Sequence, residues 1–135
     1  MSLRQIIFPA ESRLFPGQRW ANIGLRTLHL LGMAGLGGGY FYAAAGGAWQ
    51  GFLYLTLGSG LALMLLSVWS NGIWLVQLRG QAILLKVLLL ALMPVWPEQR
   101  TALLVLVILI SGLIAHAPGD VRYYSLFHRR RIERL

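Results

Sequence analysis

Apolar residues are concentrated in four long segments, which are separated by short connections. The segments cover residues 23–45, 52–76, 78–96 and 101–117. A helix rises about 1.5 Å per residue, so about 20 residues cross a hydrocarbon layer of about 30 Å. The pattern therefore predicts an all-α membrane protein, with a four-transmembrane-helix bundle as its single domain over residues 23–117. Because the connections are short, we expect consecutive helices to be antiparallel neighbours.

The first apolar segment contains glycines at spacings that bring small residues onto one helix face. Gly35 and Gly39 form a Gly-x-x-x-Gly pattern, and Gly32 precedes Gly35 by three residues. In lipid, small residues let two helix backbones approach closely, and packing takes the place of the hydrophobic effect. We expect this face to pack against another helix of the same chain, with a dimer interface as the alternative.

The two ends of the chain differ from its apolar middle. Residues 1–22 mix apolar residues with arginines and two prolines, which is typical of an interfacial segment at the membrane surface. Because its charged part is long for a signal peptide, we expect the segment to remain as an uncleaved anchor. Residues 118–135 form a basic tail in which apolar residues recur near helical spacing, and this pattern predicts a C-terminal amphipathic basic helix.

Composition supports the membrane assignment, and charge sets the orientation. Hydrophobic residues make up 57% of the chain and charged residues only 12%, about half the charged share of a soluble domain. The formal charge of +8 does not indicate nucleic-acid binding, because most basic residues flank the apolar segments. Ten of the twelve lysines and arginines fall on one side of a four-span chain, with Lys86 inside the membrane and Arg100 opposite. We therefore expect a bacterial inner-membrane protein with both termini in the cytoplasm.

The sequence contains few residues that suit catalysis. The absence of cysteine excludes disulfides, thiolate metal sites and cysteine nucleophiles. The acidic residues lie outside the apolar segments or at their ends, so they provide neither a carboxylate proton path nor a carboxylate metal core in the membrane. These residues are Glu11, Glu98, Asp120 and Glu133. We therefore expect a protein that is not an enzyme.

Two histidines lie at comparable depth on the cytoplasmic side of the predicted bundle. His29 is in the first segment and His116 is at the end of the fourth. Two neutral imidazoles on neighbouring helices can ligate a b-type haem, and a glycine-rich helix face leaves room for the porphyrin. The alternative is that each histidine makes a hydrogen bond and that no cofactor is bound. His128, within the arginine run, is expected to contact solvent or lipid headgroups.

Lys86 is the charged residue deepest inside the third segment, because Arg79 lies at the start of that segment. Lys86 lies about two helical turns from the cytoplasmic end, so its stem can extend to place the ammonium group at the interface. The alternative is that Lys86 faces the bundle and bonds to Ser67 or Asn71 of the second segment. In that position it could also neutralise an anionic headgroup, a quinone oxygen or a haem propionate. We expect the interfacial position.

Two stretches of the chain carry a resemblance to a known family. The residues Leu28 to Gly32, which lead into Gly37 to Gly39, and the lone lysine within Leu84 to Leu88 resemble the copper-resistance protein D-like group of membrane proteins. The resemblance covers about two of the four helices. It implies a four-helix unit that handles copper or haem, with His29 as the ligand position that carries over. The chain is short for this group and lacks its methionine- or histidine-rich outer face.

Together these features favour a non-catalytic accessory or assembly subunit of a larger inner-membrane complex, of the respiratory or photosynthetic kind. The alternative is a haem b or copper-binding electron-transfer subunit that uses His29 and His116. The expected partners are other membrane subunits and anionic phospholipid. A cluster of arginines in the tail suits either contact. These arginines are Arg122, Arg129, Arg130, Arg131 and Arg134.

Overall fold

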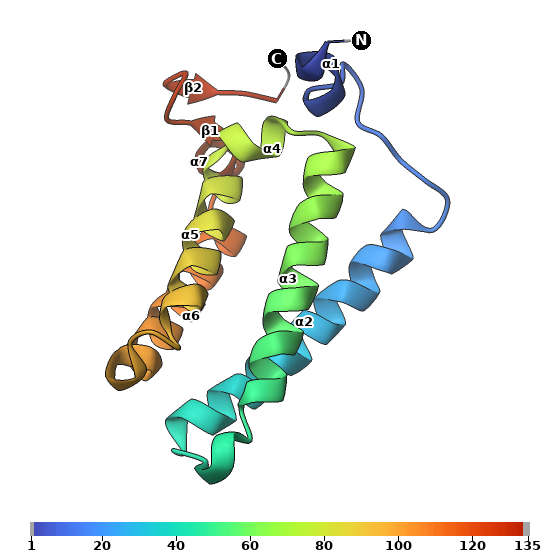
Figure 1. Cartoon of the computed structure of the whole chain (residues 1–135). Helices are drawn as coiled ribbons and strands as arrows, with labels where there is room; N and C mark the ends of the chain where they lie inside the picture. Colours follow the sequence, from blue (N-terminus) through green and yellow to red (C-terminus); the bar gives the residue numbers. More distant parts are fainter. Residues whose placement is uncertain (1, 134–135) are drawn as a thin grey trace.

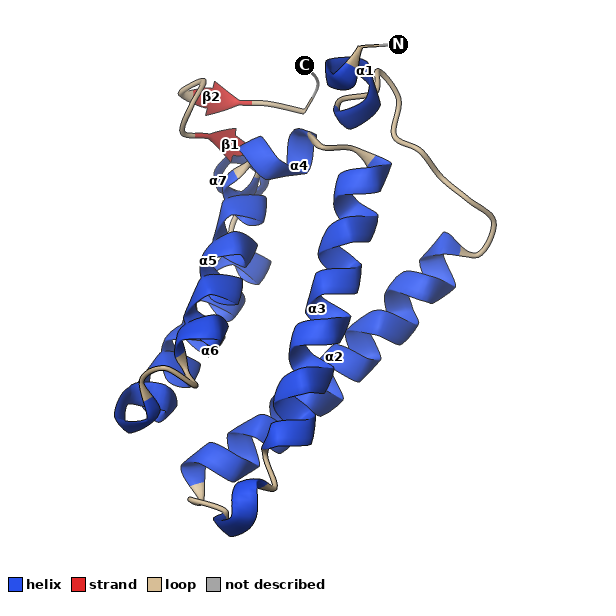
Figure 2. Cartoon of the chain, in the orientation of Figure 1, coloured by secondary structure: helices blue, strands red, loops and turns tan. Residues whose placement is uncertain are grey.

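The computed structural model describes residues 2–133 and is mostly helical, as the sequence predicts. The helices are α1 (Leu3–Ile7), α2 (Gln18–Phe41), α3 (Gln50–Ser70), α4 (Ile73–Val76), α5 (Leu78–Leu92), α6 (Arg100–His116) and α7 (Gly119–Arg122), with 3-10 turns η1 (Ala45–Gly47) and η2 (Pro97–Gln99). A small antiparallel hairpin pairs β1 (Tyr124–Ser125) with β2 (Arg130–Arg131). Two helical hairpins, α2 with α3 and α5 with α6, form the body of the molecule (Figures 1 and 2).

Within the described residues, two helical stretches are long and apolar enough to cross a membrane. They are Gln50–Ser70 and Pro97–His116, and they overlap the second and fourth predicted segments. The helix α2 has a more polar start than predicted because it begins at Gln18, inside the expected interfacial segment. The helix α5 ends at Leu92 rather than at residue 96, and it has 15 residues. Four crossings of the membrane therefore stay a prediction.

The second predicted segment is broken near its end. The helix α3 stops at Ser70, and the side-chain oxygen of Asn71 accepts a hydrogen bond of 3.0 Å from the backbone N–H of Ile73. Asparagine favours such turns because its short side chain competes with the helical backbone bonds. The N–H of Gly72 also donates to the carbonyl of Ile7 at 2.8 Å. This break turns the chain from α3 into α4 and toward the second hairpin.

The helices α2 and α3 approach closely along the glycine face. A Cβ atom on Gly32 would lie 2.8 Å from the backbone nitrogen of Thr56, which is too close for any side chain. A Cβ on Gly35 would overlap the Phe52 ring, and one on Gly39 would meet the side chain of Trp49. The structure therefore places Gly32 and Gly35 against α3 of the same chain, and Gly39 against Trp49, the residue that precedes α3.

The two hairpins meet at the end of the molecule that carries the α2–α3 and α5–α6 connections, which we call the loop end. A cluster of buried apolar residues joins them there: Leu36, Tyr40, Leu53, Leu89, Leu90, Met93, Leu104 and Val107. The guanidinium carbon of Arg100 lies 5.0 Å from the ring centre of Tyr40 and 5.1 Å from that of Trp49. These cation–π contacts add to the attraction that holds the two hairpins together at the loop end. The core therefore occupies one half of the bundle.

The opposite end, which we call the terminal end, carries α1, α4, α7 and the β-hairpin (Figure 1). Arg13 and Ser70 are joined twice, by a backbone bond of 2.9 Å and by the Ser70 hydroxyl donating to the Arg13 carbonyl at 2.9 Å. The buried side chain of Gln77 donates to the carbonyl of Ile132 at 2.7 Å, and Ile132 is only 3% exposed. Both terminal segments are therefore fixed to the turn between the two helical hairpins.

The predicted C-terminal amphipathic helix is wrong. After the single turn of α7, the chain reverses between β1 and β2, and the hydroxyl of buried Ser125 lies 3.1 Å from the Nδ1 atom of His128. Arg131 pairs with Asp120 at 2.6 Å and also with Glu133. The packing of Ile132 on Gln77 and these ion pairs favour a hairpin over the local helical pattern. Arg134 and Leu135 lie outside the described residues.

Candidate functional site

A cavity of about 700 Å³ lies between the two helical hairpins, on the side of the core that faces the terminal end. This volume falls within the range of about 300–1,000 Å³ that is typical of small-molecule sites. Residues of α2, α3, α5 and α6 line it, and Trp74 of α4 contributes as well. The apolar part of the lining consists mainly of long aliphatic side chains, including Met33, Leu57, Met64 and Leu90. This lining suits a hydrocarbon chain of a ligand.

The charged residues of this cavity are both basic. Arg26 comes from α2 and Lys86 from α5, so the two hairpins contribute one cation each. None of the described residues that line the cavity is acidic. A polar and positive region therefore lies beside an apolar one, and uncompensated charge in such a place is costly unless an anion or water reaches it.

His29 also lines the cavity and is held by two hydrogen bonds to α3. Its Nδ1 atom lies 3.0 Å from the carbonyl oxygen of Thr56 and 3.1 Å from the hydroxyl of Ser59. Because a carbonyl oxygen only accepts, Nδ1 carries the hydrogen and donates it. The Nε2 atom of a neutral ring then keeps its lone pair, which is the tautomer that a metal-ligating histidine uses. The predicted hydrogen-bonding role of His29 is thus present, and the ring could also act as a ligand.

Lys86 does not contact Ser67 or Asn71, the two partners named in the alternative interpretation of the sequence. Its ammonium group donates to the hydroxyl of Ser111 on α6 at 3.1 Å, and that hydroxyl in turn donates to the carbonyl of Val107. The hydroxyl of Ser67 instead donates to the carbonyl of Leu63. Lys86 therefore faces the bundle. The residue that fixes the direction of its side chain is Ser111, not Ser67 or Asn71. The interfacial position that we expected for Lys86 is not the one observed.

The second predicted haem ligand lies elsewhere. His116 is the last residue of α6 and is exposed, and it is not among the residues that line the cavity with His29. The structure therefore offers a haem one imidazole in the cavity rather than an opposed pair. His128 is exposed in the β-hairpin. Among residues 2–133 there is no group of three or more histidine, aspartate or glutamate side chains placed to hold a metal ion.

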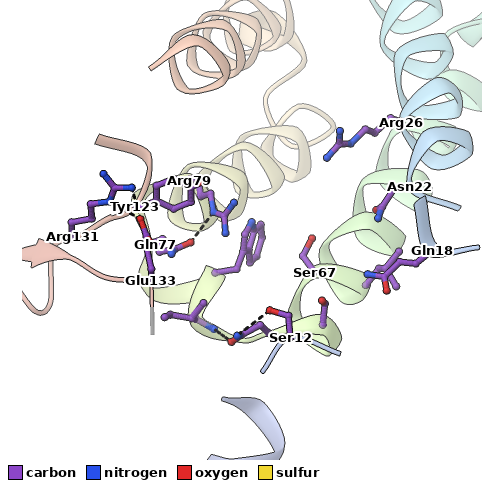
Figure 3. Close-up of a pocket in the computed structure, with 15 residues that line it drawn as sticks. Ser12, Gln18, Asn22, Arg26, Ser67, Gln77, Arg79, Tyr123, Arg131 and Glu133 are labelled. Atoms are coloured by element: carbon purple, nitrogen blue, oxygen red, sulfur yellow. Dashed lines mark hydrogen bonds and ion pairs between the residues drawn. The ribbon is translucent and has the colours of Figure 1, made fainter. Parts of the chain in front are cut away.

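A second, more polar pocket of about 560 Å³ continues the cavity toward the terminal end (Figure 3). The two share four lining residues, which are Asn22, Arg26, Ser67 and Trp74. Arg79 lines the polar pocket, donates to the Gln77 side chain at 2.7 Å and stacks 4.8 Å from the ring centre of Tyr123. This hydrogen bond and the ring contact fix the direction of the guanidinium group. The polar pocket therefore extends the positive region of the cavity outward.

The sequence did not single out Arg26, Arg79 or Ser111 as site residues, because the two arginines were counted only as topology determinants. One pattern could have pointed to Arg26. It lies eight residues after the start of α2, and Lys86 lies eight residues after the start of α5. Both helices start at the terminal end, so at about 1.5 Å per residue each cation lies about 12 Å along its helix. Because Arg26 and Lys86 lie at the same distance along helices of two packed hairpins, the two cations are expected to lie near each other.

The tail arginines have different surroundings. Arg131 forms ion pairs with Asp120 and Glu133, and hydrogen bonds to these two carboxylates raise its pKa. Arg122 is partly buried, with its guanidinium carbon 5.7 Å from the ring centre of Tyr123. Arg129 and Arg130 are exposed at the β-hairpin, and Arg134 lies outside the described residues. Among the tail arginines that the structure describes, Arg129 and Arg130 are the two that are exposed and form no ion pair with a described residue.

Comparisons of the chain with protein-family models, with curated proteins and with solved structures find no match to any of the three. The resemblance to the copper-resistance protein D-like group therefore stays a prediction.

Proposed function

We propose that the chain is a four-span inner-membrane protein that serves as a non-catalytic accessory subunit of a larger membrane complex. In this proposal α2, α3, α5 and α6 cross the membrane, and the terminal end faces the cytoplasm. The distribution of basic residues supports this orientation. The 15 residues of α5 cover about 23 Å, and its neighbours α4 and η2 lengthen the path across the membrane.

The observation that carries the proposal is the shape of the β-hairpin tip. Leu126 and Phe127 are 59% and 75% exposed, and Arg129 and Arg130 follow them directly. Aromatic residues and arginine are the residue types enriched at the centres of protein interfaces. The bonds of Ile132 and Arg131 hold this tip in a fixed conformation. A rigid loop that displays these groups suits docking to an acidic surface of a partner subunit.

A haem-binding electron-transfer subunit is the second candidate, and one observation favours it. His29 presents the tautomer that suits a ligand, in a cavity with apolar walls. A haem would have to find its other axial ligand away from His116, or remain five-coordinate.

One purification separates the two candidates. The tagged chain is extracted from its native membrane in mild detergent, its assembly size is determined, and its absorbance spectrum is recorded. We expect a colourless assembly well above 15.0 kDa, with fixed stoichiometry to larger subunits. A monomer would contradict the accessory role. A Soret band that is lost on His29→Ala and kept on the matched change His128→Ala would establish the haem alternative instead.

A further inference from the structure

The cavity between the helical hairpins and the polar pocket beside it form one continuous site with two different halves. Arg26 belongs to both, since it lines the cavity and the pocket. Figure 3 shows Arg26 reaching from α2 into the space between the hairpins. The half toward the core is apolar, and the half toward the terminal end is polar. A ligand that fills both halves must be amphiphilic.

The charges of the residues that line the site indicate the charge of the ligand's polar headgroup. The cavity has two cations, Arg26 and Lys86, and no acidic residue among the described residues of its lining. In the polar pocket Arg79 is the additional cation, because Glu133 offsets Arg131 there. A neutral head, such as that of a quinone, would leave the two cations of the cavity uncompensated in a region of low polarity. The head is therefore anionic.

Hydrogen-bond donors narrow the chemistry further. Besides Arg26, the shared part of the site offers the N–H donors of the Asn22 side-chain amide. Arginine and lysine together with such donors suit the several oxygens of a phosphate group. Both cations lie about 12 Å from the starts of α2 and α5, on the side of the core that faces the terminal end. Basic pockets between helices on the cytoplasmic side are a recurring form of lipid headgroup site.

We propose that this site binds one anionic membrane phospholipid. Its phosphate lies between Arg26 and Lys86, and Ser111 positions the lysine for this contact. One acyl chain occupies the apolar part of the cavity beside Met33, Leu57 and Leu90. The lipid thereby joins the two helical hairpins in the half of the bundle where the protein core does not join them. This proposal does not depend on whether the chain is part of a larger complex.

The test measures lipid retention by the full chain in native mass spectrometry. The protein is exchanged into detergent with either phosphatidylglycerol or phosphatidylcholine, and both lipids are titrated. We expect one tightly held phosphatidylglycerol per chain and at least fivefold weaker retention of phosphatidylcholine. Removing one cation, as Arg26→Gln or Lys86→Met, should weaken phosphatidylglycerol binding about five- to tenfold.

The control is Arg19→Gln, which removes an exposed arginine of α2 that lines neither half of the site. It should change binding by less than twofold. Arg26 is also exposed, so its substitution keeps the packing intact even if Lys86→Met reduces stability. Equal retention of both lipids, or wild-type binding by Arg26→Gln, would overturn the proposal. Complete displacement of the lipid by millimolar inorganic phosphate would do so too, because it would show that a free anion suffices.

Discussion

Replacing Gly32 by leucine is expected to separate α2 from α3 and to lower the free energy of unfolding by about 3 kcal/mol or more. The reason is that the new side chain would meet the backbone of Thr56, which cannot move aside without shifting α3. The effect of Gly35→Leu should be smaller, because Gly35 faces the partly exposed side chain of Phe52, and a side chain can shift at lower cost than a backbone segment. Thermal unfolding in detergent, followed by circular dichroism, measures both.

The matched control is Gly38→Leu, made on the same helix. A Cβ atom on Gly38 has no neighbour within 4 Å, so the leucine there has space. Because leucine favours helix over glycine by up to about 1 kcal/mol, this variant should be as stable as the wild type or slightly more stable. Equal melting of the Gly32→Leu and Gly38→Leu proteins would show that the glycine face does not pack on α3.

Exchanging Arg129 and Arg130 together for lysine is expected to deplete the chain from its assembly at least tenfold while leaving membrane insertion unchanged. Lysine preserves the charge that attracts anionic lipid, but it loses the planar paired bonds that guanidinium makes with carboxylates. Phe127→Ala should deplete the chain similarly, because truncating a central aromatic contact commonly costs about 2 kcal/mol or more. Quantitative mass spectrometry of the purified complex gives the occupancy.

Arg131→Lys serves as the internal comparison for this experiment. Arg131 bonds to Asp120 and Glu133 within the chain, so its substitution tests the stability of the β-hairpin rather than outward docking. It should cause less depletion than the double substitution at Arg129 and Arg130. Full occupancy of both the double lysine variant and Phe127→Ala would contradict docking and would leave the hairpin tip as a lipid anchor.

The sequence predicted the helical class and the positions of the main helices, because apolar composition over 17 to 25 residues dominates local preferences. It also identified Gly32, Gly35 and Gly39 as packing residues, since small residues at this spacing have few other uses in lipid. It failed at the tail, where residues 118–135 show a helical pattern. The buried bonds of Ile132 and the ion pairs of Arg131 join residues too distant in sequence for a periodic pattern to show them.

The candidate site was predicted only in part. His29 and Lys86 were singled out because polar residues inside apolar segments are costly. Their surroundings were not predictable, because the cavity depends on where the two hairpins diverge. The Ser111 contact of Lys86 also depends on the rotation of α6, and the nearly continuous apolar sequence of that helix gives no information about its rotation. Arg26 can be identified as a site residue only from the structure, which shows that it lines the same cavity as Lys86.

Both the orientation and the docking proposal depend on four crossings of the membrane, and labelling of introduced cysteines tests this number directly. The chain contains no cysteine, so single substitutions need no other change. The positions Glu11, Ala48, Glu98 and Phe127 are exposed. With four crossings, a membrane-impermeant maleimide added outside intact cells should label positions 48 and 98 but not 11 and 127. If only α3 and α6 crossed, positions 48 and 98 would lie on opposite sides, and labelling of just one of them would contradict the four-span account.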